Sequence, residues 1–71
     1  MDNLIKEYRK NLGMTQEQLA RMVDVSSRTI ISLEKGQYKP SLLLAYKLSL
    51  VFHVTIEELF KLSENLERME N

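Results

Sequence analysis

Apolar residues recur every three or four positions along most of this chain, and that spacing is typical of amphipathic α-helices. The clearest stretch is residues 15–36, TQEQLARMVDVSSRTIISLEKG. Leu19 and Val23 share one face of a first helix, and Ile30 and Leu33 share one face of a second. Both faces are expected to point inward, because only a short connection separates the two helices. The stretch therefore predicts a helix, a tight turn and a second helix.

The same periodicity predicts helices on both sides of this pair. The helix that follows the pair is apolar on several sides, so either it is the central helix of the core or part of its surface contacts another subunit. A last apolar stripe, formed by Leu62, Leu66 and Met69, is either a short sixth helix or a frayed tail. The sequence thus predicts an all-α bundle of five helices. They are expected to cover about residues 2–12, 16–23, 27–35 and 42–52 and a segment that begins after Thr55.

Hydroxyl side chains precede four of the expected helices, where they can accept hydrogen bonds from the first free backbone amides. Thr15 and Thr55 are each followed three residues later by Gln or Glu, which is the spacing of a capping box. Ser26 and Ser41 stand at the other two starts. A glycine follows the first and the third helix, where a left-handed residue commonly ends a helix.

The second helix of the central pair carries the chemistry that suggests a function. Opposite its buried face it presents Ser27, Arg28, Ile31 and Ser32, which combine hydrogen-bonding groups with one methyl-rich side chain. Such a surface fits the major groove of DNA, where the bases present hydrogen-bonding edges and thymine methyl groups. Arg28 can form two hydrogen bonds with a guanine, and Ile31 either contacts a thymine methyl or is an ordinary surface residue.

With this helix pair, the chain resembles the Cro/repressor-type (Xre-type) helix-turn-helix family over roughly residues 4–60. The resemblance implies a DNA-binding domain of the phage-repressor type over residues 1–61, with residues 62–71 as a C-terminal tail that can contribute to a dimer interface. Where the family usually has Gly, this chain has Asp24 and His53, and both are expected to be left-handed at some cost in stability. The residues that carry the resemblance are Gln16, Leu19, Ala20, Val23, Val25, Ser26, Thr29, Ile30, Leu33, Glu34 and Gly36.

The resemblance also implies roles for individual residues. In the proteins that this chain resembles, an Arg at the position of Arg9 pairs with a Glu at the position of Glu34, and the pair locks the first helix to the reading helix. The loop after the reading helix is placed against the sugar-phosphate chain, although the ring of Tyr38 can instead pack on the next helix. We expect base contacts from Ser27, Arg28, Ile31 and Ser32 and phosphate contacts from Gln16, Ser26, Thr29, Lys35, Gln37, Tyr38 and Lys39.

Composition and charge narrow the function further. A chain of 71 residues makes one domain with a small core. It has no Cys and one His, His53, so disulfides are excluded and no spacing is typical of a metal site, a cofactor site or a catalytic centre. Residues 1–40 carry seven Lys and Arg against five Asp and Glu, and residues 41–71 carry three against five, so the basic excess lies in the half with the reading helix. No leader opens the chain and no apolar run could span a membrane, so a cytoplasmic location is expected.

The sequence therefore predicts a sequence-specific, double-stranded DNA-binding transcriptional regulator, a repressor, that reads the major groove with residues 27–35. One copy contacts too few base pairs to select an operator among roughly a million or more competing sites, so we expect a homodimer on an inverted repeat, joined through the second half of the chain. The alternative is an antitoxin-like module that mainly binds a protein partner, with DNA binding secondary. An enzyme and a small-molecule ligand are not expected.

Overall fold

The computed structural model describes residues 1–37 and 39–70, the last two as backbone only. Every regular element in this part of the chain is an α-helix, which confirms the expected all-α class. The apolar stripe near the C-terminus forms a sixth helix instead of a frayed tail, although the side chain of Met69 lies outside the described atoms. The helices are α1 (Ile5–Asn11), α2 (Gln16–Met22), α3 (Ser27–Glu34), α4 (Leu42–Phe52), α5 (Ile56–Leu59) and α6 (Leu62–Glu70).

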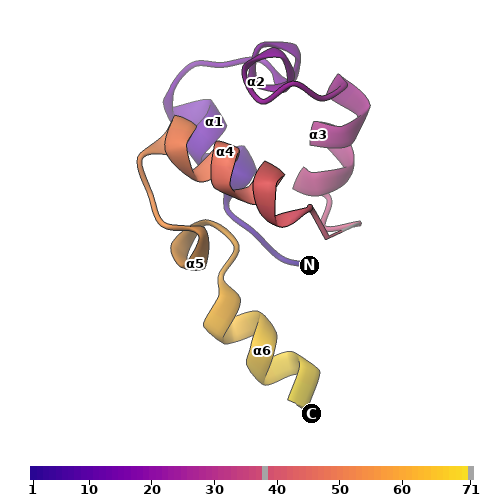
Figure 1. Cartoon of the computed structure of the whole chain (residues 1–71), viewed down its shortest axis with the longest axis vertical. Coiled ribbons are helices and arrows are strands. Elements are labelled where there is room, and N and C mark those ends of the chain that lie inside the picture. The colour runs from indigo at the N-terminus through magenta and orange to yellow at the C-terminus, as the bar shows by residue number, and fades with distance from the viewer. Residues whose placement is uncertain (38, 71) are drawn as a thin grey trace.

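Five of the helices form the body of the molecule, and the sixth extends from it. Figure 1 shows α2 and α3 together at one end, α4 crossing in front of α1, and α6 projecting from the opposite end. This projection accounts for the elongated shape, with extents of 36 × 22 × 20 Å. The helix-turn-helix and α6 are therefore held apart by the core and by α5.

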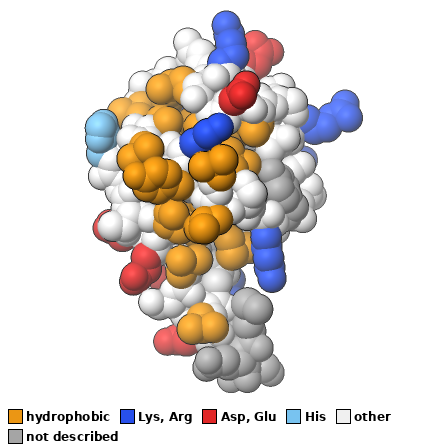
Figure 2. All heavy atoms as spheres, viewed as in Figure 1, with side chains coloured by type: hydrophobic (Ala, Val, Ile, Leu, Met, Phe, Trp, Pro, Cys, Tyr) orange, Lys and Arg blue, Asp and Glu red, His pale blue; other side chains and the backbone are white. Residues whose placement is uncertain are grey.

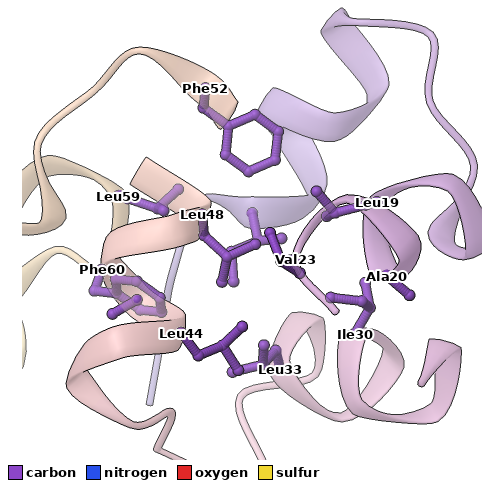
Figure 3. Close-up of a cluster of buried hydrophobic side chains, with 12 residues drawn as sticks. Leu19, Ala20, Val23, Ile30, Leu33, Leu44, Leu48, Phe52, Leu59 and Phe60 are labelled. Atoms are coloured by element: carbon purple, nitrogen blue, oxygen red, sulfur yellow. The ribbon is translucent and has the colours of Figure 1, made fainter. Parts of the chain in front are cut away.

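The core is a single cluster of apolar side chains contributed by α1 to α5 and the connections between them (Figure 3). The inward faces predicted for the central pair are confirmed, because Leu19, Val23, Ile30 and Leu33 are all at most 1% exposed. The ring of Phe52 stacks on Tyr8 with the ring centres 5.7 Å apart, which joins α4 to α1 at the edge of the cluster. The buried apolar residues are Ile5, Leu19, Ala20, Val23, Ile30, Leu33, Leu44, Ala45, Leu48, Phe52, Leu59 and Phe60.

The structure adds two details to the predicted apolar pattern. The first helix was expected to extend to residue 12, but α1 ends at Asn11 and Leu12 is 56% exposed in the turn that follows. The fourth helix has a buried side, where Leu48 is fully covered, and an exposed apolar side, where Leu42 is 79% exposed. α4 is thus a core helix whose outer face still presents apolar side chains to solvent.

The predicted hydroxyl caps are all in place. Thr15 accepts a hydrogen bond from the Gln18 amide at 3.0 Å, and the Gln18 side chain accepts one from the Thr15 amide at 2.8 Å, so the first capping box is complete. Ser26, Ser41 and Thr55 each accept from the amide three residues further on. These bonds satisfy backbone donors that the helices themselves leave free, and so fix where each helix begins.

Five helices end at a residue with a left-handed backbone, which lets the chain turn back toward the core. At four of these ends, the amide of the residue after the left-handed one bonds to a carbonyl five residues earlier, as in Val25 N–H to Ala20 C=O at 3.0 Å. The left-handed conformations expected of Asp24 and His53 are confirmed, with φ of 61° and 56°. The sequence did not indicate the left-handed conformation of Lys61, which follows α5. The five residues are Gly13, Asp24, Gly36, His53 and Lys61.

The left-handed positions predict a matched pair of stability changes. Gly13→Ala should lower the free energy of unfolding by about 1 kcal/mol, because an L side chain is strained at φ 68° while the new Cβ meets no neighbouring atom. His53→Gly should raise it by about 0.5–1 kcal/mol, because it removes that strain from an exposed residue. Thermal unfolding followed by circular dichroism should show melting temperatures that move in opposite directions. A decrease for both variants would contradict the strain argument.

Candidate nucleic-acid interface

The outward face of α3 is the candidate surface for reading bases. Its opposite face is fixed in the core by Ile30 and Leu33, which are both fully buried. Arg28 is exposed on the outward face, whereas Ile31 and Ser32 are half-buried and therefore less accessible than the helical pattern predicts. Figure 1 shows α3 at the edge of the molecule beside α2, so its outward face is not covered by another helix.

The first turn of α3 is organised by two hydroxyl groups. Ser26 accepts a hydrogen bond from the Thr29 amide at 3.3 Å, and the hydroxyls of Ser26 and Thr29 lie 3.2 Å apart. The Ser26 side chain is exposed, and Ser27 and Thr29 are half-buried beside it. A hydroxyl both donates and accepts, so these groups can still bond to an outside acceptor such as a phosphate oxygen. The turn thus presents small polar groups at the N-terminal end of α3, where Arg28 also lies.

The pair of Arg9 and Glu34 lies at the other end of α3. Arg9 Nε donates to Glu34 Oε2 at 2.6 Å, and Arg9 Nη2 donates to Glu34 Oε1 at 3.2 Å, so the ion pair is bidentate. The two side chains are only 10% and 5% exposed. Arg9 Nη1 also donates to the Met14 carbonyl at 2.8 Å, which ties the pair to the turn between α1 and α2.

Gln16 joins this network, which sequence reasoning did not anticipate. Its side-chain nitrogen donates to Glu34 Oε1 at 3.1 Å, so the first residue of α2 is linked to the last residue of α3. An amide nitrogen has two hydrogens, and the second remains available to an acceptor outside the protein. Gln16 is half-buried, and the Glu34 bond holds its side chain in one orientation. A signal was present in the sequence, because Gln16 and Glu34 both belong to the family pattern.

The end of α3 and the connection after it carry three exposed polar side chains. Gly36 ends the helix with φ of 71°, and the amides of Gly36 and Gln37 bond back to the carbonyls of Leu33 and Ser32 at 2.9 and 3.0 Å. Gln37 and Lys39 then follow in exposed positions, as does Lys35 just before Gly36. Tyr38 lies outside the described residues, so neither of its two expected roles can be assigned.

Other kinds of site find no support in residues 1–37 and 39–70. No cluster of three or more His, Asp or Glu side chains there could hold a metal ion. His53 is exposed and is the left-handed residue between α4 and α5. None of the described helices combines the length and the apolar character needed to cross a bilayer.

Comparisons with known proteins agree with this geometry. A family model described as helix-turn-helix matches residues 5–67. The chain is 55% identical over 60 residues to an HTH-type transcriptional regulator of Archaeoglobus fulgidus, which covers 84% of this chain and 86% of that protein. A regulator of the same description from Methanocaldococcus jannaschii is 50% identical over 60 residues, covering 84% of this chain and 91% of the relative. One from Bacillus subtilis is 44% identical over 64 residues, covering 90% and 97%.

The ion pair predicts strong coupling between Arg9 and Glu34. Glu34→Ala should lower the free energy of unfolding by about 3 kcal/mol, because it leaves a largely buried guanidinium without its partner. The double change Arg9→Met with Glu34→Leu should recover much of this loss, although the Met14 carbonyl then loses its donor. Urea unfolding of the two single variants and the double variant gives the coupling energy. Additive losses would contradict the bidentate contact.

Proposed function

This chain belongs to the helix-turn-helix family of DNA-binding transcriptional regulators, and from that premise we propose that it is a repressor that binds its operator as a homodimer and reads the major groove with α3. The observation that carries the proposal is the division of α3 into two sides. Ile30 and Leu33 anchor one side in the core, and Arg28 is exposed on the other. An anchored helix with a free arginine can hold a guanidinium in a fixed position against base edges.

Base reading is assigned to α3 and its first turn. Arg28 forks to the two acceptors of a guanine, and Ser27 and Ser32 accept or donate to whichever base lies opposite. Ile31 is half-buried, so only part of its side chain is available for a thymine methyl. This set mixes one strongly selective residue with three tolerant ones, so the base opposite Arg28 should be the most restricted position of each half-site.

Phosphate contacts flank the reading helix at both of its ends. Gln16, with one amide hydrogen bonded to Glu34, can donate the other to a phosphate oxygen beside α2. The hydroxyls of Ser26 and Thr29 lie at the start of α3. Beyond its end, Lys35, Gln37 and Lys39 are exposed, and the two lysines add positive charge. Contacts on both sides set the register of α3 in the groove without reading sequence.

The proposed dimer uses the apolar surface that the core leaves uncovered. Figure 2 shows apolar side chains gathered on the face where α4 lies toward the viewer and continuing toward α6. On α4 this surface includes Leu43 and Leu50, which are 64% and 54% exposed, and on α6 it includes Leu66, which is 56% exposed. A contiguous apolar surface of this kind typically marks a partner site. Because it is formed by α4 and α6, it leaves the outward face of α3 free for DNA.

Repression requires only that the bound protein occupies its operator. A dimer with two-fold symmetry presents two copies of α3 to successive major grooves about one helical turn apart, roughly 34 Å. Each half contacts the sugar-phosphate chain on both sides of the groove, so the dimer covers the DNA on which another protein would have to bind. A second domain is not needed for that effect.

Selection of bound duplexes from a random DNA pool tests the proposed function and supplies the operator. The selected sequences should converge on an inverted repeat with half-site centres about 10 base pairs apart. With that operator, Arg28→Ala should weaken specific binding by about 1–3 kcal/mol and leave binding to unrelated DNA nearly unchanged, because it removes a base contact.

Lys39→Ala is the matched control for this experiment, since Lys39 is also exposed and basic but is assigned to a phosphate. It should weaken binding to all sequences alike and reduce the salt dependence by about one unit of slope. Fluorescence anisotropy titrations at several salt concentrations measure both quantities. If the two variants lost specific and non-specific binding in the same ratio, the division into base and phosphate contacts would be wrong.

The dimer surface predicts different effects for two equally exposed leucines. Leu66 on α6 and Leu12 after α1 are both 56% exposed, so a glutamate at either position should leave the fold intact. Leu66→Glu should convert the dimer to a monomer at micromolar concentration, because it places a charge in the apolar interface. Leu12→Glu should leave the dimer unchanged. Sedimentation equilibrium checks both, and a monomeric wild-type chain that binds its operator singly would refute the dimer.

A further inference from the structure

Residues 1–4, here called the strap, connect two parts of the molecule that do not lie side by side. The side-chain amide of Asn3 is the centre of this connection. Its nitrogen donates to the Leu33 carbonyl in the last turn of α3 at 2.7 Å and to the Met1 carbonyl at 3.1 Å. Its oxygen accepts from the Ile5 amide at 3.1 Å, at the start of α1. One side chain therefore links the strap, the start of α1 and the end of the proposed reading helix.

The same four residues are held from the other side by α5 and α6. Asn65, which is 9% exposed, donates to the Asp2 carbonyl at 2.9 Å and also to the Phe60 carbonyl at 2.7 Å. The Leu4 amide donates to the Leu59 carbonyl at 2.9 Å. The bonds at Asp2 and Leu4 involve backbone atoms of the strap, so they fix its path and do not depend on which side chains it carries.

An exposed group of charges adds to this attachment. The Asp2 carboxylate lies 3.2 Å from the Lys61 ammonium and 3.6 Å from the Arg68 guanidinium. The hydrogen bond from Lys61 lowers the pKa of Asp2 below its usual value, and the same bond raises the pKa of Lys61. Because the carboxylate is about half exposed, solvent screens these pairs, and the backbone bonds of Asn65 are the stronger part of the attachment.

The strap also packs closely on the end of α3. A Cβ atom added to Gly36 would lie 3.1 Å from the Met1 carbonyl oxygen, so the backbone of the strap occupies the space that a side chain would need there. Figure 1 shows the start of the chain running between α3 and the α5–α6 end. The strap is thus in direct contact with the turn that ends α3, and it is anchored to α6 at its other side.

We propose that Asn3 is a positioning residue for DNA recognition, and that the strap makes the placement of α3 depend on α6. This inference rests on the proposed function, in which α3 reads bases and α6 contributes to the dimer. The last turn of α3 is then tethered from two directions, because Arg9 and Gln16 hold Glu34 while Asn3 holds the Leu33 carbonyl. Two tethers on one turn fix the direction of the helix as well as its position. Base reading needs this, because a side chain must be held within a fraction of an ångström and about 10–20° of its productive geometry.

The first arm of the test separates the Asn3 bond to Leu33 from the Asn3 bond to the Ile5 amide. Asn3→Ser retains an oxygen that can accept from the Ile5 amide, but it removes the nitrogen that donates to Leu33. Loss of this one neutral hydrogen bond should reduce operator affinity roughly three- to tenfold. Affinity for unrelated DNA and the monomer–dimer equilibrium should not change. Asn3→Asp removes the same donor with the same shape, and the two variants should agree in direction.

The second arm tests the connection to α6. Asn65→Ala removes the buried side-chain bond to the strap without touching α3, and only the Leu4–Leu59 bond and the exposed ion pairs of Asp2 remain there, so it should lower operator affinity by a similar factor. In the double variant with Asn3→Ser the loss should be no greater than the larger single loss, because both changes release the same element. Asp2→Asn is the matched control: it keeps the carbonyl that Asn65 holds, removes only the exposed ion pairs, and should behave like the wild type.

Hydrogen exchange in the free protein provides a measurement that does not require DNA. The Gly36 and Gln37 amides bond to carbonyls in the last turn of α3, and both should exchange several-fold faster in Asn3→Ser and in Asn65→Ala. Unchanged exchange in Asn65→Ala, or additive losses of operator affinity in the double variant, would overturn the proposal. If the wild type bound no operator, the proposed function would fail, and the exchange rates would still decide whether the strap holds α3. Should Asn65→Ala not fold, the two Asn3 variants still test the bond to α3, and Asn65→Ser, whose shorter side chain lacks the donor to Asp2, replaces it in the test of the connection to α6.

Discussion

The bidentate contact between Arg9 and Glu34 is the interaction on which the position of α3, the proposed reading helix, depends. Burying both charged groups costs desolvation free energy, which the attraction between them and the extra bonds to Met14 and Gln16 offset. The main effect of the pair is therefore to fix the geometry of the helices that it joins, and its net contribution to stability is small. A guanidinium and a carboxylate in fork-to-fork contact must be coplanar, so the pair holds α1 and α3 at one distance and one orientation. The bond from Gln16 extends this restraint to the start of α2.

The helix ends show how far the sequence alone could predict the fold. Thr15, Ser26 and Ser41 are recognisable starts because a hydroxyl in front of a helical pattern has a specific partner in the first turn. Asp24 and His53 were identified as left-handed by their alignment with family glycines, and the structure agrees. These left-handed conformations were therefore predicted from the family pattern more than from the chemical nature of Asp and His.

Lys61 marks the limit of such reasoning. Its φ of 49° separates α5 from α6, yet lysine has no particular preference for this conformation. The Lys61 ammonium bonds to Asp2, 59 residues away, and Asn65, which bonds to the nearby carbonyls of Phe60 and Lys61, also bonds to the distant carbonyl of Asp2. The Asn3–Leu33 and Gln16–Glu34 bonds are of the same kind. No local period or spacing predicts them, since they depend on which helix ends the folded chain brings together.

The arrangement also explains how a chain without net charge can serve as a DNA-binding protein. Arg28, Lys35 and Lys39 are exposed on α3 and the connection after it, whereas the acidic residues of the second half lie mainly on α5 and α6 at the other end of the molecule. A phosphate chain near α3 therefore experiences a local positive field, because charges beyond about 8–10 Å are largely screened at physiological salt. The acidic end is compatible with a protein contact through the apolar face of α4 and α6. In the proposed dimer, a contact formed at the α6 end must still orient α3 at the other end, and residues 1–4 are bonded to both.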